Sequence, residues 1–190
     1  SETEIQLSNF VMKSVFHLNN GTNNSQRIIF LQRHSREKHL VEVFSSEMKP
    51  ESFETILKSK RCTFFGSGYE MKKIFSYMMD FEKEADILQM LGWYPDHKVY
   101  AFADAVFAED HKLYKADNLG IVDAGEKNFY LPAFGYANLL NEDYKIQRLY
   151  KFNPGKTDFK TWADLYFKAY GNNGTIGILF TVLSAFRDII

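Results

Sequence analysis

Residues 144–160 combine basic and aromatic side chains, a combination that can bind nucleic acid. The segment holds five Lys or Arg residues against one acidic residue, Asp158. Basic side chains neutralise phosphates and aromatic rings stack on bases, so both contributions to nucleic-acid affinity are present. We expect the interface to consist of Lys145, Arg148, Tyr150, Lys151, Lys156 and Lys160. The alternative is an exposed edge strand over 145–152, protected from aggregation by its lysines, with the rings in the core.

A second candidate is Gly66-Ser67-Gly68, which lies between a short apolar strand pattern and a helical pattern. Backbone N–H groups at such a helix start can bind a phosphate or another anion. The segment has neither the third glycine of a dinucleotide-binding fingerprint nor the Gly-Lys-Ser/Thr of a P-loop. We therefore favour a tight turn in which Ser67 caps the helix and Glu70 completes a capping box, with anion binding at Gly66, Ser67 and Gly68 as the alternative.

Two acidic pairs form a third candidate, because carboxylates four residues apart share one face of a helix and can hold Mg²⁺. The pairs are Asp80 with Glu84 and Glu82 with Asp86. We favour a solvated helix face, since Lys83 lies between them. The five histidines show no zinc-ligand spacing, and Cys62 is the only cysteine. We therefore expect no catalytic residue, no metal site and no cofactor in this chain.

Composition narrows the classes of protein further. The 190 residues are 45% hydrophobic and 16% aromatic, enough for a buried core, which excludes a disordered chain. The formal net charge of -1 excludes a general attraction to nucleic acid or anionic lipid, so such binding needs a local patch. A single cysteine excludes a disulfide-stapled secreted domain and favours a cytoplasmic protein. The apolar run that begins at Ile176 is much shorter than the roughly 20 residues that span a bilayer, so we expect a buried helix and no membrane partner.

Hydrophobic periodicity predicts an α+β fold with largely antiparallel sheets. Strands are expected over 9–18, 27–33 and 39–45, with Phe10, Met12, Phe16 and Leu18 on one face of the first. The polar residues 19–25 are expected to form the turn of a hairpin between the first two strands, and the third strand continues from it. Helices are expected over 50–59, over 68–91 as one long helix, and as two C-terminal helices, the first over 159–170. The remaining strands are expected over 99–107, 112–114, 120–122, 128–131 and 145–152.

These elements suggest two parts. We expect an α+β domain over residues 1–135, followed by a strand and two helices over residues 136–190. The final apolar run reaches Ile190 without a stop signal, which leads us to expect a longer parent protein.

Two stretches of the sequence resemble a known family. One runs from Glu84 to Leu91-Gly92-Trp93 and continues in the apolar pattern of residues 99–107; the other runs from Tyr170-Gly171-Asn172-Asn173-Gly174 to Ile190. They resemble an uncharacterised domain that precedes the P-loop ATPase in primase/helicase proteins of bacteriophages and mobile elements, notably in Bacteroides-like bacteria. The resemblance implies that the nucleotide-binding loop, with its ATP and Mg²⁺, lies beyond Ile190, and it implies no catalytic residue in this chain.

The expected function is that of a non-catalytic accessory domain of a replication primase/helicase. Such a domain would bind nucleic acid or position the downstream ATPase domain, and it could form a homo-oligomer. The alternative is a protein-interaction or oligomerisation module that binds no nucleic acid. An independent enzyme that uses the acidic pairs is a third, less favoured hypothesis.

Overall fold

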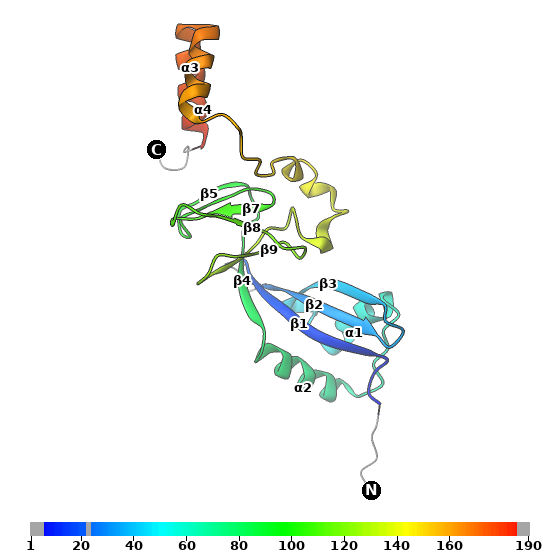
Figure 1. The fold of residues 1–190 in the computed structure, drawn as a ribbon. Helices are drawn as coiled ribbons and strands as arrows, with labels where there is room; N and C mark the ends of the chain where they lie inside the picture. The colour runs from blue at the N-terminus through cyan, green and yellow to red at the C-terminus, as the bar shows by residue number, and fades with distance from the viewer. Residues whose placement is uncertain (1–5, 22–23, 186–190) are drawn as a thin grey trace.

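The computed structural model describes residues 6–21 and 24–185 and confirms the α+β class, with sheets that are mainly antiparallel. Figure 1 shows a large sheet with helices α1 and α2 beside it, a smaller sheet next to it, and a helical hairpin at the opposite end of the molecule from α2. The helical hairpin consists of the two predicted C-terminal helices.

The large sheet has six strands in the order β3-β2-β1-β4-β10-β9. They are β1 (Phe10–Asn19), β2 (Gln26–Arg33), β3 (Lys38–Phe44), β4 (Lys83–Ile87), β9 (Ile121–Asp123) and β10 (Asn128–Tyr130). Strands β1, β2 and β3 form the antiparallel meander that the sequence predicts, whereas β4 is parallel to both β1 and β10. Strand β4 therefore joins the N-terminal meander to the later part of the chain.

A bulge at Val15 in β1 divides the apolar residues of this strand between two cores. Ser14 lies opposite Ile29 and Phe16 lies opposite the adjacent Ile28, so Val15 is an extra residue in the pairing. Because adjacent residues of β2 point to opposite faces, side chains before and after the bulge face different cores. The two sets are Phe10 with Met12, and Phe16 with Leu18. The prediction that these four share one face is wrong, because alternation alone does not reveal an inserted residue.

Helices α1 (Pro50–Ser59) and α2 (Gly68–Met79) cover the core that contains Phe10. The predicted capping box at the start of α2 is confirmed. The Ser67 hydroxyl accepts from the Glu70 backbone N–H at 3.3 Å, and the Glu70 carboxylate accepts from the Ser67 backbone N–H at 2.6 Å. A short 3-10 turn, η1 (Ser45–Glu47), precedes α1.

The long helix predicted over 68–91 is wrong beyond Met79. The chain leaves the helix at Asp80, and Lys83 begins strand β4. Ala85 is buried on this strand, at 2% exposure, between β1 and β10. The apolar spacing of this stretch is compatible with a helix, but pairing with two strands distant in sequence determines its structure.

The smaller sheet is an antiparallel meander in the order β5-β6-β7-β8. Its strands are β5 (Gly92–Tyr94), β6 (Val99–Ala101), β7 (Ala105–Phe107) and β8 (Leu113–Lys115). The strand predicted over 99–107 is thus two strands, since a turn at residues 102–104 separates β6 from β7. Their buried side chains share a core with β9 and β10 through Val122 and Phe129.

The strand predicted over 145–152 is also wrong. Residues 136–149 form three 3-10 turns, η2 (Tyr136–Asn138), η3 (Glu142–Tyr144) and η4 (Gln147–Leu149). The predicted final helices are confirmed as α3 (Phe159–Tyr170) and α4 (Asn172–Ala185), and Gly171 connects them with a positive φ of 57°. Glycine adopts this conformation without the steric cost that a side chain would impose.

Candidate functional site

Two of the six residues predicted to bind nucleic acid have side chains that form hydrogen bonds or an ion pair within the protein. The Arg148 guanidinium donates to the backbone carbonyls of Asn138 at 2.9 Å and Asn141 at 2.8 Å. These bonds hold the successive 3-10 turns together, which explains why this segment is not a strand. The Lys145 ammonium lies 3.0 Å from a carboxylate oxygen of Glu142. Arg148 therefore has a structural role, and the charge of Lys145 is offset locally.

Residues 150–152 are anchored on the smaller sheet. The Tyr150 carbonyl accepts from the Ala103 N–H at 3.0 Å, and the Phe152 N–H donates to the Asp104 carboxylate at 2.7 Å. The Tyr150 ring itself is 63% exposed. The Lys151 ammonium lies 5.7 Å from the centroid of the Phe134 ring, a cation–π distance.

Lys156 and Lys160 are exposed on the linker before α3 and on its first turn. Asp158, the one acidic residue of the segment, caps α3 by accepting from the Thr161 N–H at 2.8 Å. The hydrogen bonds from Thr161, first from its N–H and then from its hydroxyl, lower the pKa of Asp158. In the part of the chain that the structure describes, neither lysine forms an ion pair with this carboxylate.

The Gly66-Ser67-Gly68 turn already holds a negative group. The Glu70 carboxylate accepts hydrogen bonds from the Ser67 backbone N–H and from the Ser67 hydroxyl, and these two bonds lower the pKa of Glu70. Glu51 and Glu54 line the small cleft beside Gly66 and Gly68. Anion binding at this turn stays a prediction, and three neighbouring carboxylates oppose it electrostatically.

The acidic pairs do not share a helix face, because their residues lie in the turn after α2 and on β4. Glu82 is buried and binds Arg27 of β2, whose Nη2 lies 3.1 Å from Glu82 Oε1. The Ser14 hydroxyl donates to the same carboxylate at 2.7 Å. Among residues 6–21 and 24–185, no three or more His, Cys, Asp or Glu side chains are grouped to hold a metal ion.

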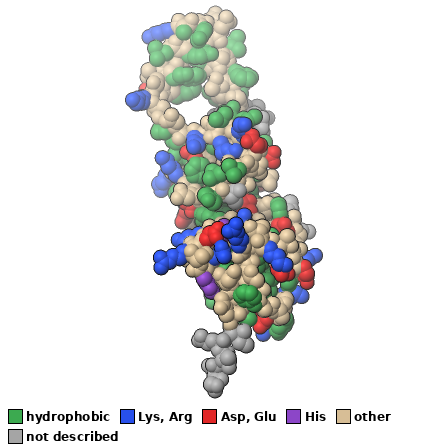
Figure 2. Space-filling model, turned by 90° about the vertical axis from the view of Figure 1, so that its right-hand side faces the viewer, with side chains coloured by type: hydrophobic (Ala, Val, Ile, Leu, Met, Phe, Trp, Pro, Cys, Tyr) green, Lys and Arg blue, Asp and Glu red, His purple; other side chains and the backbone are tan. Residues whose placement is uncertain are grey.

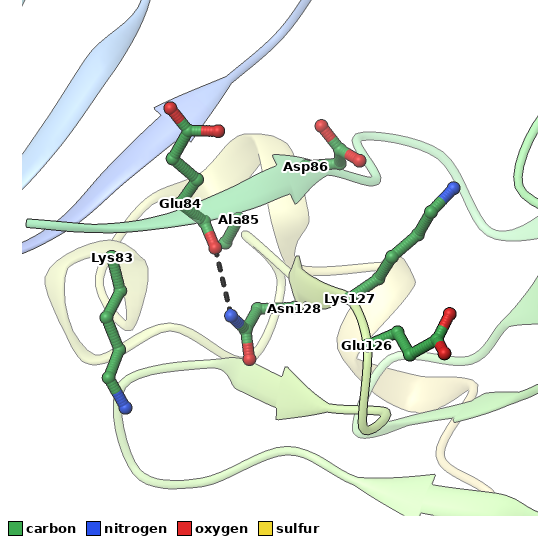
Figure 3. A pocket seen from close by; sticks show the side chains of 7 residues that line it. All are labelled: Lys83, Glu84, Ala85, Asp86, Glu126, Lys127 and Asn128. Carbon is green, nitrogen blue, oxygen red and sulfur yellow. Dashed lines mark hydrogen bonds between the residues drawn. The ribbon is translucent and has the colours of Figure 1, made fainter.

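Glu84 and Asp86 instead extend from β4 on the same side, while Lys83 extends away from them (Figure 3). They line a cleft of about 350 Å³ together with Glu126 and Lys127 of the β9–β10 turn and Asn128 at the start of β10. The Asn128 amide donates to the Glu84 carbonyl at 3.0 Å and closes one wall of the cleft. Charges of both signs surround it, whereas small-molecule sites are lined mainly by apolar side chains.

A partly buried polar cluster ties strand β3 to β10 and η2. The Glu42 carboxylate accepts from the Tyr130 hydroxyl, and from the Asn138 amide at 3.1 Å. Burial raises the pKa of Glu42, although both hydrogen bonds oppose the shift. Burial and the Glu42 charge raise the pKa of Tyr130. The three residues are 8 to 96 positions apart, so no local pattern in the sequence could have revealed this cluster.

The helical hairpin carries the largest set of exposed apolar side chains on the described part of the chain. Gly174 and Gly177 of α4 face α3, where a Cβ on Gly177 would lie 2.8 Å from the Tyr166 ring. On the rest of α4, Ile176, Leu179, Phe180 and Leu183 are 50–72% exposed. We call these four residues the α4 face.

The α4 face forms one stripe, since its residues follow the i, i+3, i+4, i+7 spacing of a helix. Residues 172–185 contain no charged side chain. Helix α3 of the same hairpin also carries exposed rings and aliphatic groups. These are Phe159, Leu165, Phe167 and Tyr170. Figure 2 shows the hairpin projecting above the rest of the molecule with hydrophobic side chains across its surface. Contiguous exposed apolar surface of this kind marks sites that bind other molecules.

The expectation that the apolar run from Ile176 forms a buried helix is therefore wrong for the described residues, which are helical but largely exposed; the end of the run, from residue 186, lies outside the described residues. Two features of the sequence could have indicated this exposure. Residues 176–183 have no polar face, and Gly174 and Gly177 allow α3 to approach α4 on one side only.

No helix within residues 6–21 and 24–185 has both the length and the apolar character needed to cross a membrane. Comparison of the chain with protein-family models, with curated proteins and with solved structures gave no match.

Proposed function

We propose that this chain is a non-catalytic accessory domain that docks on a partner protein through the α4 face. The observation that supports the proposal is the uncharged stripe of four large apolar side chains on a hairpin that projects from the body. Burying such a side chain contributes about 1.5–3 kcal/mol, so the stripe favours association strongly once an apolar surface covers it.

The partner we propose is the P-loop ATPase domain of a replication primase/helicase, part of the same protein. This identity rests on the resemblance of residues 84–107 and 170–190 to the segment that precedes such an ATPase. The hairpin would then fix the position of the ATPase domain, while the two sheets provide a rigid support for it.

The first test is the reading frame that follows Ile190 in the parent gene. We expect a strand followed by Gly-Lys-Ser/Thr. A frame that continues without such a loop would remove the ATPase domain as the partner.

The second test measures docking directly. The separately produced segment that follows Ile190 is mixed with this chain, and complex formation is measured by analytical ultracentrifugation. Phe180→Glu places a charge in the stripe and is expected to weaken the complex at least tenfold. The matched control is Asn173→Glu, which adds the same charge to the exposed first turn of α4, where the helix dipole tolerates it. Equal binding by both variants would show that the α4 face is not the docking surface.

Nucleic-acid binding by the segment before α3 is the second candidate function. Tyr150 and Phe159 expose 63% and 60% of their surface, and Lys151, Lys156 and Lys160 lie along the same segment. Binding to a single-stranded oligonucleotide in a salt titration tests it. Charge reversal at Lys156 and Lys160 should weaken binding and flatten the salt dependence, and unchanged binding would exclude this role.

A further inference from the structure

Helix α2 carries a row of aromatic and basic side chains on its outer face. Tyr69, Lys73 and Tyr77 follow one another at intervals of four residues, and Phe81 continues the spacing just beyond the helix. Residues four apart lie one turn apart on the same side of a helix, so the row from Tyr69 to Tyr77 covers roughly 12 Å. We call these four residues the α2 row.

The rings of the α2 row are not part of the core. Tyr69 and Tyr77 are each 67% exposed and Phe81 is 71% exposed. The opposite side of α2 packs into the core through Met71, Phe75 and Met78. Because the helix already has a complete apolar face, the exposed rings contribute nothing to its packing against the sheet.

Contacts within the α2 row hold the side chains in place. The Lys73 ammonium lies 4.6 Å from the centroid of the Tyr69 ring. The Tyr77 and Phe81 ring centroids are 4.9 Å apart and their planes are inclined by 51°. Less conformational entropy is therefore lost when a ligand stacks on rings that are already ordered.

The charge beside the α2 row favours an anionic ligand. Lys72 and Lys73 are both exposed on this side of the helix. The Glu70 carboxylate is turned back onto Ser67, which leaves Asp80 at the C-terminal end as the acidic residue on the outer face. An apolar protein surface would leave both ammonium groups unpaired, whereas phosphates would pair with them.

From these observations we propose that the α2 row binds single-stranded nucleic acid, with bases stacked on Tyr69, Tyr77 and Phe81 and phosphates beside Lys72 and Lys73. Bases of a duplex are stacked on each other and do not present their faces to such rings, so a single strand is the form that fits. Stacking of this kind tolerates any base. The surface lies at the opposite end of the molecule from the helical hairpin (Figure 1), so this inference does not rest on docking through the α4 face.

The test is fluorescence anisotropy with a labelled 20-nucleotide oligo-dT, titrated with the whole chain at several salt concentrations. Tyr77→Ala and Phe81→Ala are each expected to weaken binding about tenfold. The double change of Lys72 and Lys73 to Ala is expected to reduce the slope of log affinity against log salt by about 1.4. Asp80→Lys is expected to tighten binding and steepen the slope, a gain that a merely structural role for this face would not produce.

Controls assign the loss to this surface. Tyr136→Ala removes a ring that is 58% exposed outside α2 and should bind like the parent chain. Phe180→Glu, which tests docking of the hairpin, should also leave oligonucleotide affinity unchanged. The thermal melting of every variant is compared with that of the parent chain, and exposed positions are expected to change it little.

Several results would overturn the inference. The parent chain could fail to bind oligo-dT at low salt, or bind a duplex of the same length equally well. If charge reversal of Lys156 and Lys160 abolished oligonucleotide binding and Tyr77→Ala had no effect, the binding site would be the segment before α3. The chain could instead bind vesicles of mixed anionic and neutral phospholipid but no oligonucleotide. If Tyr77→Ala then abolished vesicle binding, the α2 row would be a membrane contact.

Discussion

The buried pair of Arg27 and Glu82 should be among the most costly places to alter this protein. The two side chains are 10% and 6% exposed, and Arg27 Nε lies 3.2 and 3.1 Å from the two Glu82 carboxylate oxygens. The Ser14 hydroxyl donates to Glu82, and Arg27 Nη1 donates to the Ser45 hydroxyl at 3.0 Å. The protein therefore supplies the hydrogen bonds of both charges, and bulk water supplies little of their solvation.

Removing one partner leaves the other charge buried without compensation. We expect Arg27→Met or Glu82→Leu alone to lower the free energy of unfolding by about 3–5 kcal/mol. For a domain whose total stability is about 5–15 kcal/mol, that loss is a large fraction. The double variant should recover most of it, because an apolar pair of similar volume has no charge to desolvate.

Urea unfolding followed by circular dichroism measures these changes. At a slope of about 2 kcal/mol per molar urea, each single variant should lower the midpoint by roughly 2 M. Arg33→Met is the matched control on the same strand. It breaks an ion pair with Glu37 whose side chains are 24% and 46% exposed, and we expect a loss below about 1 kcal/mol. Single variants that lose no more than this control, or a double variant no more stable than the singles, would refute the reasoning.

Three further predictions concern other sites. Burial raises the pKa of Glu42 above its ordinary value of 4.5, so the folded state holds this proton more tightly and stability should fall as pH rises from about 4.5 through the raised value. Urea midpoints across this range should show a smaller fall in Glu42→Gln, and an identical pH profile would contradict this assignment. Arg148→Ala removes two hydrogen bonds to backbone carbonyls and should lower the free energy of unfolding by about 1.5–3 kcal/mol. It should not change the slope of oligonucleotide affinity against salt concentration; a flatter slope would show that Arg148 contacts the nucleic acid. Gly174→Ala places a methyl carbon 2.9 Å from the backbone carbonyl oxygen of Tyr166, so α3 and α4 have to move apart. It should lower the stability of the helical hairpin by about 1–3 kcal/mol, detected as earlier loss of helical circular dichroism, whereas an unchanged melting curve would mean that the two helices adjust freely.

Local signals in the sequence predicted the parts of the fold that local interactions determine. Ser67 and Glu70 specify the start of α2 because both halves of the capping box lie within four residues. The polar turn after residue 18 and the apolar runs on either side likewise predicted the hairpin of β1 and β2. The end of α2 could not be found in this way, since the strand at Lys83 exists only through its pairing with β1 and β10.

The candidate site was less predictable than the fold. The basic composition of residues 144–160 indicates an interface, but only the folded chain shows that Arg148 is used by the carbonyls of Asn138 and Asn141. The bulge at Val15 was hidden for a similar reason, because an inserted residue leaves the spacing of apolar residues in β1 unchanged. In each case the deciding contact depends on the folded backbone: the carbonyls 7 and 10 residues before Arg148 come within reach only through the successive 3-10 turns, and the bulge is defined only by pairing with β2.

The position of β4 has a consequence for how this protein folds. The pairing of Phe16 with Lys83, and of Asp86 with Phe129, closes two long loops around one short strand. Closing long loops costs entropy before any contact is gained, so we expect the meander of β1, β2 and β3 to form early and the insertion of β4 to limit the rate. Pulsed hydrogen exchange during refolding should then protect the amides of β1 and β2 before those of β4. Until β4 is in place, the edge of β1 presents unpaired backbone groups, and aggregation during refolding should compete at that step.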